Sequence, residues 1–203
     1  MSSTLTTLRA VVTDALGRTD TLAVSWADRG LNYGQLLAAK LYSPEELKTS
    51  STLTVAASGT SVSLSTLTGM YFLTSIYNTT NAGPVYLGDF NRFQYVVPTG
   101  AGNVKYAARY GSTLYTRPTP TATNTLTVYY VKYPTELTSA SQTIDFDHYD
   151  SFITSFALQY AWACQEEKES SDIFTSILTT INSGEQVSDK TRQQIEQYLK
   201  FPA

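Results

Sequence analysis

The sequence is poor in the residues on which most metal and catalytic sites depend. It has one histidine and one cysteine among 203 residues. Structural zinc takes four Cys or His ligands and catalytic zinc about three protein ligands, so a histidine-based zinc site is nearly excluded. The single cysteine, Cys164, excludes an internal disulfide and favours folding in a reducing cytoplasm. We therefore expect no metal and no cofactor.

Charge and long apolar runs are also scarce. Charged residues make up 15% of the chain, against roughly 25% in an average soluble domain. The net charge of −3 lacks the basic excess of a dedicated nucleic-acid binder. No apolar run approaches the roughly 18 residues that suggest a membrane span. Residues 1–10 lack the basic-then-apolar order of a secretory signal, and we expect no membrane partner.

What the sequence has in abundance is hydroxyl groups. Serine and threonine together account for 52 of the 203 residues, and tyrosine accounts for another 15. Hydrophobic residues make up 42%, which is enough for a core, and a chain of this length buries roughly 70% of its unfolded surface. A surface with few charges and many hydroxyls is common in proteins that stay in contact with other proteins.

Apolar periodicity predicts helices in the N-terminal part of the chain. Apolar residues recur at every third or fourth position over residues 4–16, and a second helix is expected over 22–42. Gly30 and Gly34 in that second helix either weaken it or allow close packing. The Ser-Pro-Glu-Glu sequence at 43–46 matches a capping box and predicts the start of a further helix.

The middle of the chain predicts short strands. Residues 71–77 and 126–133 have strand patterns, and hairpins are expected over 52–64 and 103–117. Residues 89–95 predict a short helix. Several short strands at this spacing are typical of an antiparallel sandwich or a small barrel.

The C-terminal part returns to helical patterns. A long helix is expected over about residues 145–169, and shorter ones over 171–181 and 188–201. Leu158 and Trp162 fall on the polar side of the long helix. Two large apolar groups at such positions need a partner, which is either another part of the chain or another subunit.

These patterns predict an α+β fold. We expect helical segments over residues 1–49 and 135–187, with an inserted antiparallel β domain over residues 50–134 between them in the sequence. A break at Ser183-Gly184 separates off a short amphipathic tail over residues 188–203.

The densest acidic cluster contains Asp145, Asp147 and Asp150 together with His148. A calcium site is conceivable, but the spacing lacks the glycine and the glutamate of an EF-hand loop. Carboxylates that accept backbone N–H groups at a helix start are the favoured interpretation. His148, Asp150 and Ser151 could supply a catalytic triad, yet residues this close on one helix point apart and no nucleophile elbow is present. We expect no catalytic residue.

Other features of the middle block also have alternative interpretations. Its aromatic residues could build a platform for sugars, although such residues more often form core and interfaces. The Asn78-Thr79-Thr80 acceptor for glycosylation is expected to be unused, and Cys164 to be a buried hydrophobe. Four basic residues could contact nucleic acid, although scattered charges on a sheet surface are favoured: Arg92, Lys105, Arg109 and Arg117.

The order of the segments resembles a known family. The sequence LTVYYVKYPTEL at 126–137 and IDFDHYD at 144–150, leading into an Ala-rich helix, carry most of the resemblance. Segments 7–18, 28–32 and 42–47 precede the β block in matching order. Over nearly its whole length the chain resembles the head-to-tail adaptor, or connector, proteins of tailed bacteriophages.

The resemblance implies that the N- and C-terminal helical segments form a bundle that frames the β domain. It also implies a structural virion protein without catalytic residues. Its subunits would form a ring, commonly a dodecamer, between the portal and the tail, in the neck of a virion assembled in the host cytoplasm. The implied partners are other copies of the chain, the portal protein, tail or nozzle proteins, and DNA passing through the ring lumen.

The resemblance also gives roles to particular residues. Leu158 and Trp162 suit a subunit interface. A C-terminal extension that docks onto the portal suits the apolar residues of the tail, which are Ile195, Tyr198, Leu199 and Phe201. The alternative is a carbohydrate-binding or other tail-associated β module, which Tyr-rich, charge-poor strands would serve equally well.

Overall fold

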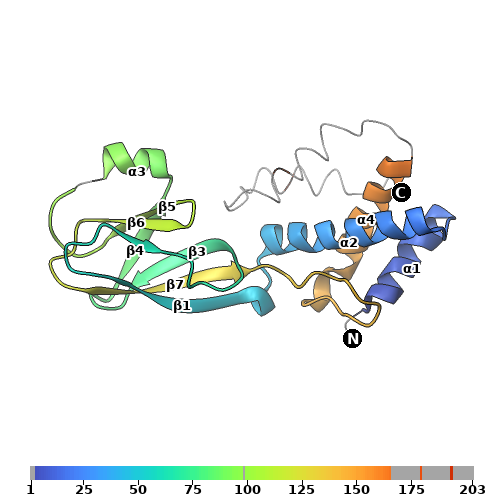
Figure 1. Cartoon of the computed structure of the whole chain (residues 1–203), viewed down its shortest axis with the longest axis horizontal. Coiled ribbons are helices and arrows are strands. Elements are labelled where there is room, and N and C mark those ends of the chain that lie inside the picture. Colours follow the sequence, from blue (N-terminus) through green and yellow to red (C-terminus); the bar gives the residue numbers. More distant parts are fainter. Residues whose placement is uncertain (1–2, 98, 166–178, 180–192, 194–203) are drawn as a thin grey trace. The chain divides into compact units, whose positions relative to one another are not determined.

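The computed structural model describes residues 3–97 and 99–165 and the single residues 179 and 193 (Figure 1). The chain divides into two compact units. We call residues 1–47 with 133–203 the helical unit, and residues 48–132 the β unit. The described residues form four α-helices and seven strands, so the predicted α+β class is confirmed.

The helical unit contains three of these helices, and their ends follow local chemistry. They are α1 (Leu5–Leu16), α2 (Thr21–Tyr42) and α4, which is described over Asp150–Gln165. The Asp20 carboxylate caps α2 by accepting hydrogen bonds from the N–H groups of Leu22 and Ala23 at 3.0 and 3.1 Å. Among the described residues, no helix is long and apolar enough to cross a membrane.

The prediction that a further helix starts at Ser43 is wrong. Ser43 instead ends α2, with a left-handed φ of 48°, and its N–H donates to the Ala39 carbonyl. Pro44 follows this C-cap, where proline is common because it cannot continue a helix. The glutamates then form only a 3-10 turn, Glu45–Leu47, which runs directly into the first strand.

Glycine allows α2 to approach α4 closely. A Cβ atom at Gly30 would lie 2.8 Å from Ala157 Cα, and one at Gly34 would lie 3.0 Å from the Ile153 carbonyl oxygen. Both glycines therefore serve close packing, which settles the alternative left open by the sequence. Ile153 and Ala157 are both fully buried at this contact.

Seven strands form one mixed sheet in the β unit, in the order β1-β7-β3-β4-β5-β6-β2. β1 and β2, at the two ends of this order, also approach each other, so the sheet is nearly closed. The strands are β1 (Lys48–Val55), β2 (Ser61–Ser63), β3 (Met70–Asn78), β4 (Gly83–Gly88), β5 (Tyr106–Tyr110), β6 (Thr113–Arg117) and β7 (Asn124–Lys132).

Two sequence predictions for this unit are wrong. The sheet is not purely antiparallel, because β4 and β5 pair in parallel. Parallel neighbours need a long connection, and here it contains the helix α3 (Phe90–Val96). The hairpin expected over 52–64 does not form either, since β1 pairs with β7 and β2 with β6. The hairpin expected over 103–117 is confirmed as β5 and β6.

A buried amide lies at the start of β7. Asn124 is 1% exposed, and its Nδ2 donates to the Ala122 carbonyl at 3.0 Å. Its Oδ1 accepts three hydrogen bonds, from Asn78 Nδ2 at 2.8 Å, Asn81 Nδ2 at 3.0 Å and the Val104 N–H at 3.2 Å. This amide ties the end of the crossover that precedes β5 to β3 and β7.

The same amide cluster bears on the glycosylation motif. Asn78 is also 1% exposed, and its Nδ2 donates to the Val104 carbonyl at 3.1 Å as well as to Asn124. Its side chain is therefore inaccessible to a modifying enzyme in the folded β unit.

Candidate interaction surfaces

The outer face of α4 carries the two residues assigned to a subunit interface. Phe156, Ala157 and Ala161 are buried on the side that packs within the helical unit, whereas Leu158 is half-buried and Trp162 is 41% exposed. The predicted polarity of the helix is thus confirmed at these positions. An exposed tryptophan is a common energetic anchor at protein interfaces.

Cys164 lies near the same end of α4 and is a free thiol that is half-buried, not fully buried as expected. Tyr160 lies one turn before Cys164 on the same helix. Burial raises the pKa of the Tyr160 phenol to about 12, and the neighbouring Cys164 and Tyr33 raise it further. The Tyr160 ring meets the Tyr33 ring edge-on, with centroids 5.6 Å apart.

This raised pKa predicts a loss of stability at high pH. An unfolded tyrosine titrates near pH 10, so the contribution is fully present below about pH 10 and is lost as the pH rises towards 12. Tyr160→Phe should therefore flatten the fall in unfolding free energy between about pH 10 and 12, measured by urea titration. A fall as steep as that of the wild type would contradict this assignment.

Two carboxylates of the acidic cluster contact other segments of the helical unit. Asp145 accepts the Thr135 N–H at 2.6 Å, and Asp150 accepts a hydrogen bond from the Ser3 hydroxyl. Both carboxylates thus fix segments of the helical unit, and the expectation that they cap a helix start is wrong for these two. His148 is exposed. The described residues contain no group of three His, Cys, Asp or Glu side chains that could hold a metal ion.

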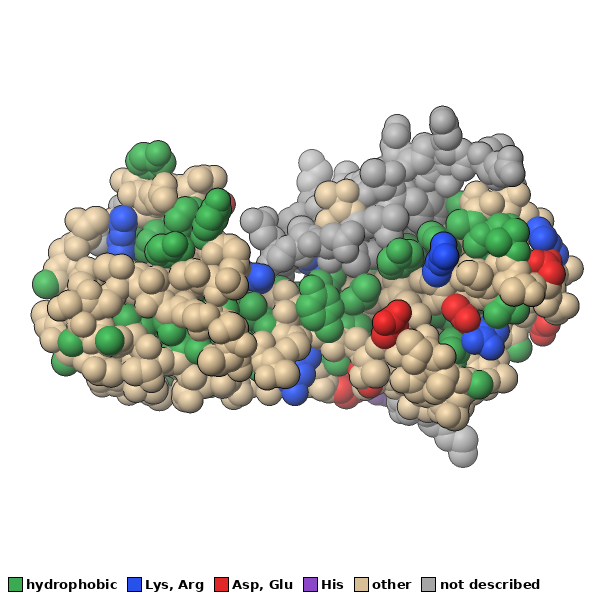
Figure 2. Space-filling view, viewed as in Figure 1, with side chains coloured by type: hydrophobic (Ala, Val, Ile, Leu, Met, Phe, Trp, Pro, Cys, Tyr) green, Lys and Arg blue, Asp and Glu red, His purple; other side chains and the backbone are tan. Residues whose placement is uncertain are grey.

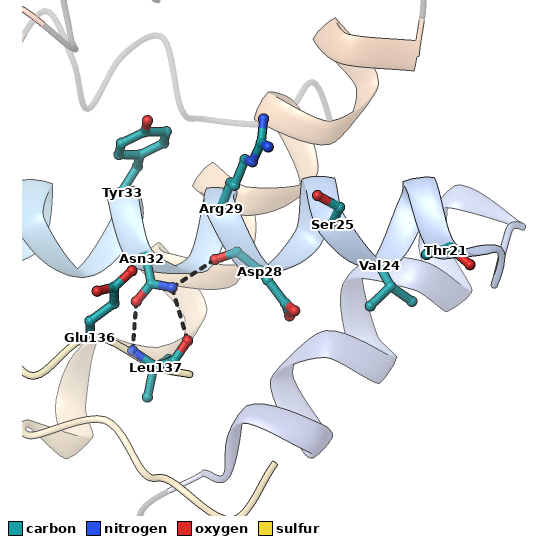
Figure 3. A pocket seen from close by; sticks show the side chains of 9 residues that line it. All are labelled: Thr21, Val24, Ser25, Asp28, Arg29, Asn32, Tyr33, Glu136 and Leu137. Atoms are coloured by element: carbon teal, nitrogen blue, oxygen red, sulfur yellow. Dashed lines mark hydrogen bonds between the residues drawn. The ribbon is translucent and has the colours of Figure 1, made fainter. Parts of the chain in front are cut away.

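A concave surface lies along α2. Its volume is about 450 Å³, and it is lined by Thr21, Val24, Ser25, Asp28, Arg29, Asn32, Tyr33, Glu136 and Leu137. Figure 3 shows that Arg29 and Tyr33 point to the same side of the helix. Arg29 and Glu136 are exposed, so both signs of charge are available to a partner. We call this set of residues the α2 concavity.

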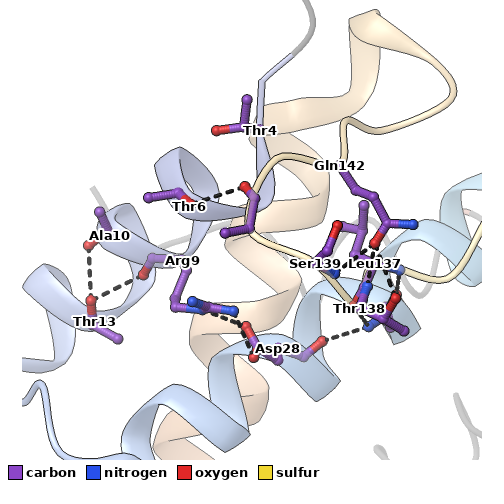
Figure 4. Close-up of polar contacts among 12 residues, drawn as sticks. Thr4, Thr6, Arg9, Ala10, Thr13, Asp28, Leu137, Thr138, Ser139 and Gln142 are labelled. Carbon is purple, nitrogen blue, oxygen red and sulfur yellow. Dashed lines mark hydrogen bonds and ion pairs between the residues drawn. The ribbon is translucent and has the colours of Figure 1, made fainter.

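Polar contacts hold the floor of the α2 concavity in place. The Asn32 side chain forms two hydrogen bonds with the backbone of Leu137. Its Oδ1 accepts the Leu137 N–H at 2.8 Å, and its Nδ2 donates to the Leu137 carbonyl at 3.1 Å. Arg9 and Asp28 form a two-point ion pair at 2.7 and 2.9 Å (Figure 4). Gln142 Oε1 accepts the N–H groups of Thr138 and Ser139 at 2.6 and 2.7 Å.

A second surface lies on the β unit, where aromatic rings gather around α3. Rings from α3 and the strands beneath it form two groups: Tyr86 with Tyr106 at 5.7 Å, and Phe90 with Tyr110 at 4.7 Å and with Tyr115 at 5.1 Å. Tyr86, Tyr110 and Tyr95 are 65%, 64% and 87% exposed. Figure 2 shows hydrophobic side chains over this part of the β unit.

The short helix α3 is fixed at both ends. The Asp89 carboxylate accepts the N–H groups of Asn91 and Arg92 at 2.9 and 3.1 Å. At the other end, Arg117 Nη1 donates to the carbonyls of Phe93, Gln94 and Val97, at 3.0, 3.2 and 2.9 Å. The Arg117 guanidinium also lies 4.8 Å from the centre of the Phe93 ring.

The four basic residues of the β unit therefore differ in what they can contact. The Arg117 guanidinium is hydrogen-bonded to backbone carbonyls at the end of α3. Arg109 Nε donates to the Gly111 carbonyl at 2.9 Å. Arg92 and Lys105 are exposed. The role of Arg117 has no local sequence signal, because its partners lie 20 to 24 residues earlier in the chain.

The expected portal-docking residues, Ile195, Tyr198, Leu199 and Phe201, lie outside the described residues, as do the helices expected over 171–181 and 188–201 apart from Thr179 and Gln193. Their assignment stays a prediction.

Comparison with known proteins gives the family. No curated protein matches the chain. The family model described as SU10 adaptor protein matches residues 3–194, which is nearly the whole chain and includes both surfaces described above. The chain therefore belongs to the SU10 adaptor protein family, a family of phage head-to-tail adaptors.

Proposed function

We propose that this protein forms the adaptor ring between the portal and the tail of a tailed bacteriophage. The observation that carries the proposal is the family match over residues 3–194. The described surfaces support it, because each unit exposes aromatic or mixed apolar and charged groups of the kind that interfaces use. In this proposal the protein is a structural component of the virion neck and no residue has a catalytic role.

The domain assignment belongs to this proposal. A helical bundle over residues 1–49 and 135–187 frames a β domain over 50–134, and residues 188–203 form the tail that docks on the portal. The ring is a dodecamer with DNA passing through its lumen, and tail or nozzle proteins bind its other side. A subunit in such a ring presents two different surfaces to its two neighbours, and the rotation between neighbours closes.

Trp162 provides a test of the subunit interface. Trp162→Glu places a charge on the exposed face of α4 and should lower ring assembly by about tenfold or more, because interface tryptophans commonly contribute 2 kcal/mol or more. The folded monomer should persist, since the residue is 41% exposed. Assembly with the portal protein is measured by light scattering and negative-stain microscopy.

Ala10→Glu is a matched control, because it adds the same charge at an exposed helical position, on α1 and away from the exposed face of α4. It should assemble as the wild type does. A normal ring from Trp162→Glu would remove Leu158 and Trp162 from the subunit interface.

The tail provides a separate test of portal docking. A chain ending at residue 187 should lose most of its affinity for the portal, because the truncation removes Ile195, Tyr198, Leu199 and Phe201. Affinity is measured by titrating immobilised portal protein, with the circular dichroism spectrum as the folding control. Unchanged affinity would contradict the docking role.

A further inference from the structure

The two units of the chain carry opposite charges. The β unit has six basic residues and one acidic residue, Asp89, which gives a net charge of +5. The helical unit has eight basic and sixteen acidic residues, a net charge of −8. Contacts between like units of neighbouring copies are therefore disfavoured, and contacts between unlike units are favoured.

The β unit presents a rigid projection for such a contact. Tyr95 on α3 is 87% exposed, and Arg92, one turn earlier, is exposed as well. The Asp89 cap and the Arg117 contacts hold the helix in place. Because the helix is already ordered, binding costs little backbone entropy here, and tyrosine and arginine are both enriched at interface hot spots.

The helical unit presents a hollow of suitable size and chemistry. The α2 concavity has a volume of about 450 Å³, which is within the roughly 300–1,000 Å³ range of pockets that enclose a bound group. Exposed Glu136 lies at this surface and offers a carboxylate to an incoming arginine. Exposed Arg29 offers a guanidinium to the face of an incoming aromatic ring.

We propose that Tyr95 of one copy inserts into the α2 concavity of the next copy, with Arg92 opposite Glu136. This inference rests on the proposed ring and names the contact that builds it. The contact joins two different surfaces, so it is heterologous, which is the type that generates rings when the rotation closes. The basic unit of each copy thereby meets the acidic unit of its neighbour.

Charge reversal tests the pair. Arg92→Glu and Glu136→Arg should each raise the concentration for half-maximal assembly on the portal by about tenfold, and the double variant should restore it to within about threefold of the wild type. Lys105→Glu is the control, because it reverses another exposed charge of the β unit outside this contact. Single variants that behave like Lys105→Glu, or a double variant without rescue, would overturn the proposal.

A disulfide assay separates this contact from the adaptor role. Tyr95→Cys and Glu136→Cys chains, each with Cys164→Ser, are mixed with and without portal protein. We expect a cross-link between the two chains. A Tyr95→Cys/Glu136→Cys chain that cross-links only within itself, or no cross-link at high concentration, would overturn the contact. A cross-link between chains together with no portal binding by the wild type would instead overturn the adaptor role and leave the contact standing.

Discussion

Asn124→Ala should destabilise the β unit by about 3 kcal/mol, because it leaves two buried donors, the Val104 N–H and one N–H of the Asn78 amide, without an acceptor. The alanine loses the acceptor for three donors, which are the amides of Asn78 and Asn81 and the N–H of Val104. It also loses the donor to the Ala122 carbonyl. Each unsatisfied buried group costs roughly 1–3 kcal/mol, although relaxation and water entry recover part of that total.

Amide hydrogen exchange measures this effect within the β unit. Exchange of the amides of β3, β5 and β7 should accelerate by about a hundredfold, the factor that corresponds to roughly 3 kcal/mol. Asn103→Ala is the matched control, since Asn103 is exposed and lies beside the same crossover. Equal exchange in the two variants would show that the buried amide cluster contributes little to stability.

Gly30→Ala should destabilise the helical unit by about 1 kcal/mol, the difference between a cost of overpacking and a smaller gain in helix propensity. The substitution improves helix propensity by roughly 1 kcal/mol, but its methyl carbon would lie 2.8 Å from Ala157 Cα. That neighbour is backbone, so α2 and α4 must separate, and separation loosens the contact of Ile153 and Ala157 with α2. Overpacking of this kind costs typically 1–3 kcal/mol.

Tryptophan fluorescence measures this effect selectively, because Trp26 and Trp162 are the only tryptophans and both belong to the helical unit. The urea midpoint of Gly30→Ala should fall. Gly88→Ala is the control, since a Cβ at Gly88 meets nothing within 4 Å. A wild-type midpoint for Gly30→Ala would mean that the two helices are not as close as described.

Local signals predicted most helices and several strands. The pattern over residues 4–16 corresponds to α1, which ends at Gly17 with a φ of 65°, and Asp89 caps the short helix predicted over residues 89–95. The alternating pattern of residues 126–133 corresponds to β7, a strand in the middle of the sheet order. In each case the signal and its structural consequence lie within a few residues of each other.

The errors arise where a local signal competes with distant pairing. Ser43 and the following residues match a helix start, but β1 must begin at Lys48 to pair with Val131, more than eighty residues away. Alternation around Gly59 predicted a hairpin, yet each flanking strand pairs with a distant strand instead. The parallel pairing of β4 with β5 has no signature in the strands themselves.

The candidate surfaces also differ in whether local sequence signals could predict them. The exposed position of Trp162 follows from helical periodicity alone. The α2 concavity does not, because Leu137 is held against α2 by hydrogen bonds with Asn32, which is 105 residues earlier in the chain. The position of Tyr95 likewise depends on Arg117, which joins β6 to the end of α3.

The mass of this protein mixed with the portal protein of its own phage, compared with each alone by light scattering, tests the adaptor role most directly. The account predicts a discrete complex whose added mass is a whole multiple of the 22.3 kDa chain, with a ring of new density in negative stain. Two separate species at high concentrations of both proteins would contradict the adaptor role.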